Sequence, residues 1–338
     1  MCQIVRMWWN TARFVAAFAA LVIASAEAHA QRNAVESWDP SARDFGRSMI
    51  EPGAPGDARN STLDALNKIL SSSKLSAFDR SIYLSIRAYQ LSRLGRDADS
   101  QKDIVEMGKV LPTAWPVVLS GTVPELAGGG DRAAALRTLD SALQRKPGDS
   151  WLVIAQAQVY MQIADFARAL GLLDGALVSA TSPADRRTAL YYRGHANFNL
   201  GRYPEATDDF GASLEGRNTL RSRLGPLLWH YAAQVHSRRD ARGTLAKALA
   251  SEPLDEWPLP IAKFLLGKLG AGELEVLAES GEAAKRANGK CPTALFVGVD
   301  ALRRGDKQRA REQFQLAQAR CPTVSEFNWA ANSELKRF

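Results

Sequence analysis

Three short motifs in this chain look like catalytic signatures, but each lacks the companion residues that its chemistry requires. Ser71 and Lys74 form an S-x-x-K pair, but no companion motif follows and the segment is typical of a polar helix end or loop. Residues 209–211 spell the Asp-Phe-Gly triplet of kinases inside a helical repeat, without a glycine-rich or catalytic loop. Residues 128–131 lack the lysine and hydroxyl of a phosphate loop. We therefore predict no enzyme, no catalytic residue and no cofactor.

Two histidines invite a metal interpretation. His195 and His230 fall at equivalent places in neighbouring repeats, but no acidic or thiol ligand lies at close spacing. A zinc site needs three or four ligands. The sequence therefore favours groove or core residues over a metal site.

The first thirty residues have the pattern of an export signal. Arg6 and Arg13 supply positive charge, residues 14–24 form an apolar run, and a small-x-small cleavage site ends at Ala30. The apolar run is too short to span a bilayer. We expect a signal peptide at 1–30, cleavage near Ala30, a periplasmic mature chain and no transmembrane span in it.

Export changes how the cysteines are interpreted. The mature chain keeps two of the three cysteines, Cys291 and Cys321, in an oxidising compartment. In the repeat register Cys291 precedes the first helix of the last hairpin and Cys321 follows the second helix. Antiparallel helices bring those ends together, which predicts a disulfide; the alternative is two buried free thiols.

The elements that position these residues are short helix pairs. Gly194 and Ala206 are spaced so that two antiparallel helices approach closely, Tyr203 fills the turn, and Phe210 plugs the space toward the next pair. One such pair cannot bury its apolar face alone, so copies are needed. Copies with matching small, aromatic and proline positions occupy residues 131–149, 150–177 and 291–322. Their period of about 34 residues resembles the tetratricopeptide repeat.

These repeats predict an all-α fold, a right-handed superhelical solenoid of antiparallel helix hairpins with a C-terminal capping helix. Pro124 and the adjacent glycines predict a short or kinked helix in one hairpin. The expected segments are an irregular leader at 31–60 and a solenoid at 61–338, with a degenerate hairpin near 115–130, an atypical segment at 254–290, the last hairpin at 291–322 and the cap at 324–338.

The tail carries a narrower resemblance. Its order is a Trp-His-Tyr helix, the segment EWPLPIAKFLLGKL, a final Gly-Asp turn, Cys-Pro and a terminal NSELKRF, which is similar to the NlpI-type periplasmic tetratricopeptide proteins. The resemblance implies a non-enzymatic adaptor that dimerises and holds cell-wall hydrolases and a processing protease together. Lipoprotein members carry a cysteine directly after the apolar run, where residues 26–30 here have none, so no lipid anchor is expected.

The solenoid geometry predicts a partner-binding groove. First helices of successive hairpins line the concave face, and positions one turn apart point into it. Amide, aromatic and imidazole groups there suit an extended peptide, and the alternative is that half of them are surface or packing residues. The predicted groove residues are Tyr89, Arg93, Trp151, Gln158, Gln162, Tyr191, His195, Asn199 and His230.

Charge gives a second hypothesis. Removing residues 1–30 takes two arginines and one glutamate from 43 basic and 36 acidic residues, which leaves a net charge of +6. Such patches could bind an acidic partner or an anionic envelope polymer, or could be the solvated sides of helices. Export argues against nucleic acid. The clusters are Arg217, Arg221, Arg223, Arg238, Arg239 and Arg242, and Arg303, Arg304, Lys307, Arg309 and Arg311.

Overall fold

The computed structural model describes residues 56–128, 130–250, 259–280 and 283–338, and every regular element in these ranges is an α-helix. The all-α prediction is confirmed. The predicted signal peptide and the leader up to residue 55 lie outside the described residues, and the first helix among the described residues begins at Gly56, within the predicted leader at 31–60. Within the same ranges, no helix has both the length and the apolar character needed to cross a bilayer.

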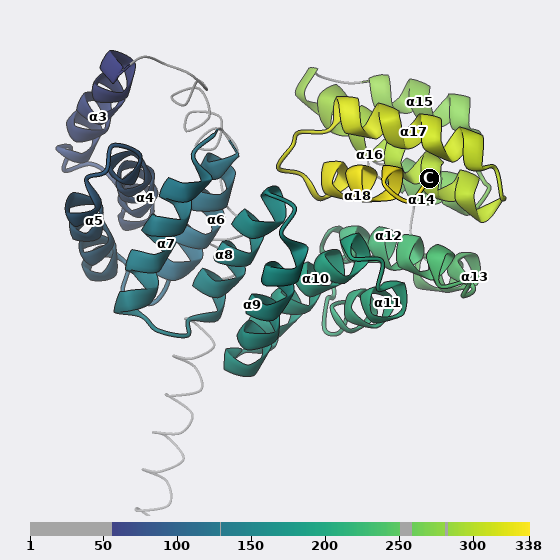
Figure 1. The fold of residues 1–338 in the computed structure, drawn as a ribbon, viewed down its shortest axis with the longest axis horizontal. Helices are drawn as coiled ribbons and strands as arrows, with labels where there is room; N and C mark the ends of the chain where they lie inside the picture. The colour runs from purple at the N-terminus through teal and green to yellow at the C-terminus, as the bar shows by residue number, and fades with distance from the viewer. Residues whose placement is uncertain (1–55, 129, 251–258, 281–282) are drawn as a thin grey trace, which may run out of the picture.

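Consecutive helices pair as antiparallel neighbours and stack into a solenoid. In Figure 1 the pairs lie side by side from α3 to α13, and α14 to α18 form a second stack next to α12. The first eight helices are α3 (Gly56–Leu70), α4 (Ala77–Arg93), α5 (Asp97–Val110), α6 (Trp115–Ala127), α7 (Arg132–Arg145), α8 (Ser150–Gln162), α9 (Phe166–Ser179) and α10 (Pro183–Asn199). The others are α11 (Tyr203–Ala212), α12 (Leu220–His236), α13 (Ala241–Ala248), α14 (Leu259–Leu265), α15 (Ala271–Glu279), α16 (Ala283–Arg303), α17 (Lys307–Arg320) and α18 (Glu326–Leu335).

Two hairpins are closed by the same glycine–phenylalanine contact. A Cβ atom at Gly194 would lie 2.8 Å from the ring of Phe210, and one at Gly298 would lie 2.7 Å from the ring of Phe314. Both rings are fully buried. The missing Cβ lets the helices of each hairpin approach closely enough for a ring to lie against the facing backbone.

An arginine–aspartate ion pair joins the two helices at equivalent positions in the α4–α5 hairpin and in the α10–α11 hairpin. Arg87 Nη2 lies 2.6 Å from Asp103 Oδ1, and Arg193 Nη2 lies 2.6 Å from Asp209 Oδ1. Asn197 also donates to Asp209, at 2.9 Å. Asp209, the first residue of the kinase-like triplet, is therefore an ion-pair partner in a hairpin. Both pairs span sixteen residues, a repeat signal that the small and aromatic positions alone did not reveal.

The hairpin expected to be degenerate has a first helix of ordinary length. Helix α6 continues through Pro124 to Ala127 and reaches thirteen residues, the same length as α8, so the predicted shortening is wrong. Proline removes one backbone donor. The carbonyl of Pro124 accepts a hydrogen bond of 2.8 Å from Gln162 Nε2 of α8, which supports the end of α6 from the next repeat.

The start of the last hairpin also differs from the prediction. Helix α16 begins at Ala283, eight residues before Cys291, so Cys291 lies inside this helix and does not precede it. Pro292, which follows Cys291, also lies in the helix interior and not in the first turn, where proline is favoured. The atypical segment before it forms the short helices α14 and α15, and α15 packs on α16.

We expect Gly298→Val to lower the free energy of unfolding by about 1–3 kcal/mol, because the added carbons must push the buried Phe314 ring aside. Urea denaturation measures the change. Gly171→Val in α9 is the matched control, since no atom lies within 4 Å of a Cβ there. Equal destabilisation by both substitutions would contradict the close-approach explanation.

Candidate functional site

Three of the nine predicted groove residues lie in the core instead. Tyr89, His195 and Asn199 are exposed by 0%, 0% and 6%. The hydroxyl of Tyr89 donates to the carbonyl oxygen of Leu126 at 3.1 Å, and burial raises the pKa of this tyrosine to about 12. The prediction that these three line an open groove is wrong, because the helical register turns them toward neighbouring helices.

The other six predicted groove residues are half-buried. Gln162 bonds to α6 as described above, and Arg93 Nη1 donates to Gln90 Oε1 at 3.1 Å. Trp151, Gln158 and Gln162 share one stripe of α8 by their spacing. The half-buried residues are Arg93, Trp151, Gln158, Gln162, Tyr191 and His230.

His195 is enclosed by aromatic rings. The ring centroids of Tyr191, Phe210 and Trp229 lie 4.6, 5.0 and 4.6 Å from that of His195, all near edge-on. Neither imidazole nitrogen of His195 has a hydrogen-bond partner within the described part of the chain. Burial lowers the pKa of His195 to about 3, so the ring is neutral. No group of three or more His, Cys, Asp or Glu residues suited to a metal ion occurs among the described residues.

The C-terminal helix α18 packs against α10 and forms a hydrogen bond with α11, in the middle of the solenoid. Ser333 Oγ donates to Asn199 Oδ1 at 2.8 Å, Arg337 Nη2 donates to the carbonyl oxygen of Asn199 at 2.7 Å, and Tyr203 donates to Glu334 Oε1 at 2.9 Å. These bonds join residues more than 130 positions apart. The predicted cap thus packs on α16 and α17 and also returns to the middle of the chain.

The loop before α18 reaches further back. A Cβ atom at Gly128, after α6, would collide with the side chain of Val324. Trp329 is buried in the apolar cluster that contains Met161 of α8, and its indole Nε1 donates to the carbonyl oxygen of Thr323 at 2.9 Å. Figure 1 shows this loop extending from α18 toward α8. The chain's own C-terminal segment therefore occupies the face on which a partner groove was predicted.

A buried polar cluster holds the far end of α18. Glu334, exposed by 2%, accepts hydrogen bonds from Tyr203 and from Arg337 Nη1, each at 2.9 Å. The His236 ring stacks on Tyr203 at a centroid distance of 4.0 Å. Burial raises the pKa of Glu334, and burial with the nearby Arg337 lowers the pKa of His236 to about 3. The sequence-based prediction did not single out Ser333, Glu334 and Arg337. Their signal was the concentration of polar and charged residues in the terminal NSELKRF.

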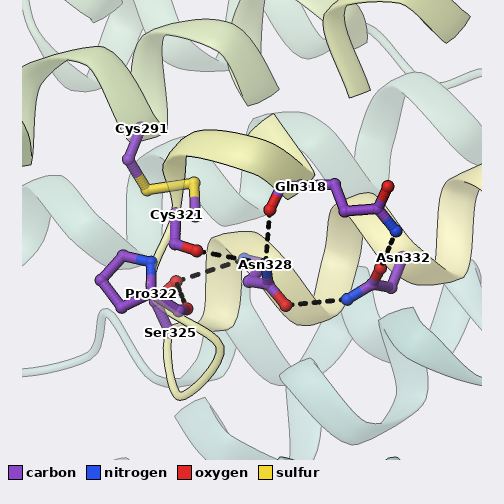
Figure 2. The surroundings of a disulfide bond; sticks show 7 residues. All are labelled: Cys291, Gln318, Cys321, Pro322, Ser325, Asn328 and Asn332. Atoms are coloured by element: carbon purple, nitrogen blue, oxygen red, sulfur yellow. Dashed lines mark hydrogen bonds between the residues drawn. A yellow bond between two sulfur atoms is a disulfide. The ribbon is translucent and has the colours of Figure 1, made fainter. Parts of the chain in front are cut away.

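Cys291 and Cys321 are joined as a disulfide, with their Cα atoms 4.8 Å apart. Cys321 is the C-cap of α17, level with the interior of α16. Figure 2 shows the next turn: Asn328 Nδ2 donates to the carbonyl oxygens of Gln318 and Cys321, at 3.0 and 3.2 Å. The disulfide and Asn328 together fix the direction in which the chain leaves α17 and enters α18.

Comparison with known proteins gives partial matches. No family model matches the chain. A curated relative, "Cellulose synthase operon protein C" of Komagataeibacter xylinus, is 33% identical over 113 residues, which are 33% of this chain and 8% of that protein. The chain thus spans less than a tenth of the length of the curated relative it matches.

Two solved structures are also similar. A tetratricopeptide repeat protein from Parabacteroides merdae has a TM-score of 0.42 and 19% identity, over 75% of this chain and 99% of that one. The C-terminal part of a TPR repeat-containing protein from Cytophaga hutchinsonii has a TM-score of 0.35 and 16% identity, over 85% and 97%. Both TM-scores lie below 0.5, and nothing about partners follows from them.

We expect residues 31–338, purified without reductant, to contain no free thiol before reduction and two after it, by mass measurement with a thiol reagent. Reduction should destabilise the terminal hairpin by roughly 3–4 kcal/mol, because the bridge no longer restricts the unfolded chain. A Cys291→Ser, Cys321→Ser double variant is the control and should not respond to reductant. Two free thiols in the untreated protein would contradict the pairing.

We expect His195 to make stability fall with acidity. Its lowered pKa means that the unfolded chain takes up a proton below about pH 6.5 while the folded chain does not, so its contribution is full above that pH and is lost progressively toward pH 3. When the pH falls from about 7 to 5, the free energy of unfolding should decrease by about 2 kcal/mol less in His195→Phe than in the unsubstituted chain. Urea denaturation at each pH measures this difference, and parallel pH profiles would contradict it.

Proposed function

We propose that this chain is an exported, non-catalytic adaptor that binds a helical segment of another envelope protein along its concave face. The docking of α18 is the observation that supports the proposal. That helix inserts Trp329 into the cluster containing Met161 and pairs Glu334 with Tyr203. A face that holds one amphipathic helix through an aromatic anchor and a few polar pairs has the chemistry needed for a second helix of similar type.

The proposed contact region lies next to α18. We place it on half-buried side chains of α4 and α8, which include Arg93, Trp151 and Gln158. These groups offer a cation, an indole and an amide, which suit an acidic or aromatic helix. Interfaces enriched in such residues commonly derive most of their affinity from a few anchors.

The resemblance of the tail to NlpI-type proteins supports a partner class. It suggests cell-wall hydrolases or a processing protease as partners, in the periplasm, and a homodimer as the assembly. A second candidate function is a structural component that binds cell-wall or other anionic polymer through the basic clusters. Arginines from both clusters line one pocket, which favours keeping this candidate.

We expect a photoreactive residue at Gln158 to crosslink to a defined envelope hydrolase or protease in living cells, because Gln158 is half-buried and follows Ala157, which shares the apolar cluster of Trp329. The same residue at Val178 of α9, which is 89% exposed, is the matched control and should give no such product. Mass spectrometry identifies the crosslinked protein, and titration of that purified protein gives its affinity.

Two results would overturn the adaptor proposal. One is the absence of a defined protein crosslink at Gln158. The other is association with isolated wall material alone, which should weaken steeply with salt if the basic clusters carry it.

A further inference from the structure

The two basic clusters of the sequence meet in one pocket. It lies between the turn joining α12 to α13 and the turn joining α16 to α17, and its volume is about 740 Å³. Sixty or more residues separate the two turns in sequence. The charged residues that line the pocket are Arg238, Arg239, Asp240, Arg242, Arg303 and Arg304.

Nearby carboxylates balance only part of this charge. Asp300, which is 1% exposed, is shared by three arginines: Arg303 Nε lies 2.9 Å from it, Arg242 Nη2 lies 3.8 Å from it, and Arg304 also contacts it. Arg239 Nη1 lies 3.0 Å from Asp208. With Asp240, five guanidinium groups meet three carboxylates, an excess of two positive charges.

Asp240 has a structural role of its own. Its carboxylate accepts a hydrogen bond of 2.9 Å from the backbone N–H of Gly243 and caps the start of α13. This bond leaves the negative charge of Asp240 in place, and Asp240 remains one of the three carboxylates counted at the pocket. The positive excess therefore lies where Arg242, Arg303 and Arg304 share the single carboxylate of Asp300.

Arg238 stands where other hairpin turns have a residue without a large side chain. Its φ is +55°, a left-handed conformation that is strained for a residue with a Cβ. The backbone N–H of Arg238 donates to the carbonyl oxygen of Val235, and that of Arg239 donates to the carbonyl oxygen of Gln234. Gly305 and Asp306 form the same pair of bonds in the turn on the other side of the pocket. The described residues at this turn position are Gly95, Ala164, Gly201, Arg238, Gly267 and Gly305.

The guanidinium of Arg238 has no ion pair or side-chain hydrogen bond to any described residue. A fold that needed only the turn would favour glycine here, as at Gly201 and Gly305. A strained arginine without a partner, at the edge of a basic pocket, indicates a group kept for a ligand. Its neighbours Arg239 and Arg304 are about half-exposed, by 46% and 57% of their side chains, and can reach the same ligand.

We propose that this pocket binds a phosphate group, either free or carried on a lipid headgroup. Arginine forks pair with two oxygens of phosphate at once, and a phosphate offers more acceptor oxygens and more negative charge than one carboxylate. A charge near two matches the positive excess of the pocket. The volume accommodates a phosphate together with part of the molecule that carries it. The site lies apart from the contacts that hold α18 and does not depend on the proposed adaptor function.

The test uses the mature chain and three probes in isothermal titration or vesicle sedimentation: pyrophosphate, citrate as a carboxylate control, and phosphatidylcholine vesicles with or without phosphatidylglycerol. We expect pyrophosphate or the anionic vesicles to bind, citrate to bind more weakly, and neutral vesicles not to bind. Binding of pyrophosphate supports a free phosphate ligand, and binding of the anionic vesicles alone supports a headgroup.

Two variants separate ligand binding from folding. Arg238→Gly combined with Arg239→Gln should weaken binding about tenfold or more, since two charge-assisted contacts are removed. Arg238→Gly alone should leave the melting temperature equal or higher, because glycine relieves the left-handed strain. Arg202→Gln is the matched control, since Arg202 follows Gly201 as Arg239 follows Arg238 and lies outside the pocket; it should bind as the unsubstituted chain does.

The proposal is overturned if neither pyrophosphate nor anionic vesicles bind, if citrate binds as tightly as pyrophosphate, or if the double variant retains full affinity. A clear loss of melting temperature in Arg238→Gly would also overturn it, because Arg238 would then be a structural residue. A failed crosslink at Gln158 would leave these outcomes unchanged, so the two proposals fail separately.

Discussion

The structure depends on the close approach of paired helices, because no hairpin here can bury its apolar face without a neighbour. Glycine opposite phenylalanine sets this distance at Gly194 and Phe210 and again at Gly298 and Phe314. A Cβ at either glycine would place atoms where the ring now lies. Arginine–aspartate pairs at the same sixteen-residue spacing join α4 to α5 and, beside Gly194 and Phe210, α10 to α11, with each carboxylate largely removed from water. Such pairs favour one register over others, since a shifted helix would leave a buried charge unpaired.

The end of the chain modifies this nearest-neighbour arrangement. In a simple solenoid each repeat contacts only the repeats beside it. Here α18 connects the last hairpin to α10 through Ser333 and Arg337 and to α11 through Glu334, contacts that a nearest-neighbour array would lack. The disulfide and Asn328 set the direction of the turn into α18. A covalent bond at the edge of the last hairpin thereby helps to place α18 against α10.

The concave face and the arginine pocket differ in their physical chemistry. The face around α18 is dry, with neutral His195 and His236 and a buried carboxylate, so an occupant must match shape and hydrogen bonds in a low-dielectric setting. The pocket at the hairpin turns is open to water and carries excess positive charge, so its attraction is long-range and sensitive to salt. One chain thus offers a selective apolar surface and a separate electrostatic one.

The sequence by itself determined the local units. The spacing of small, aromatic and turn residues gave the helix pairs and most of their positions, because these depend on contacts within about 34 residues. It did not determine which residues face the groove: Tyr89, His195 and Asn199 are buried, since one step along a helix turns a side chain by about 100° and neighbours from other repeats decide what is covered. It also could not show that α18 returns to α10 or that Arg238 and Arg304 share a pocket. Those contacts join distant segments, and only the summed curvature of the stacked hairpins brings them together.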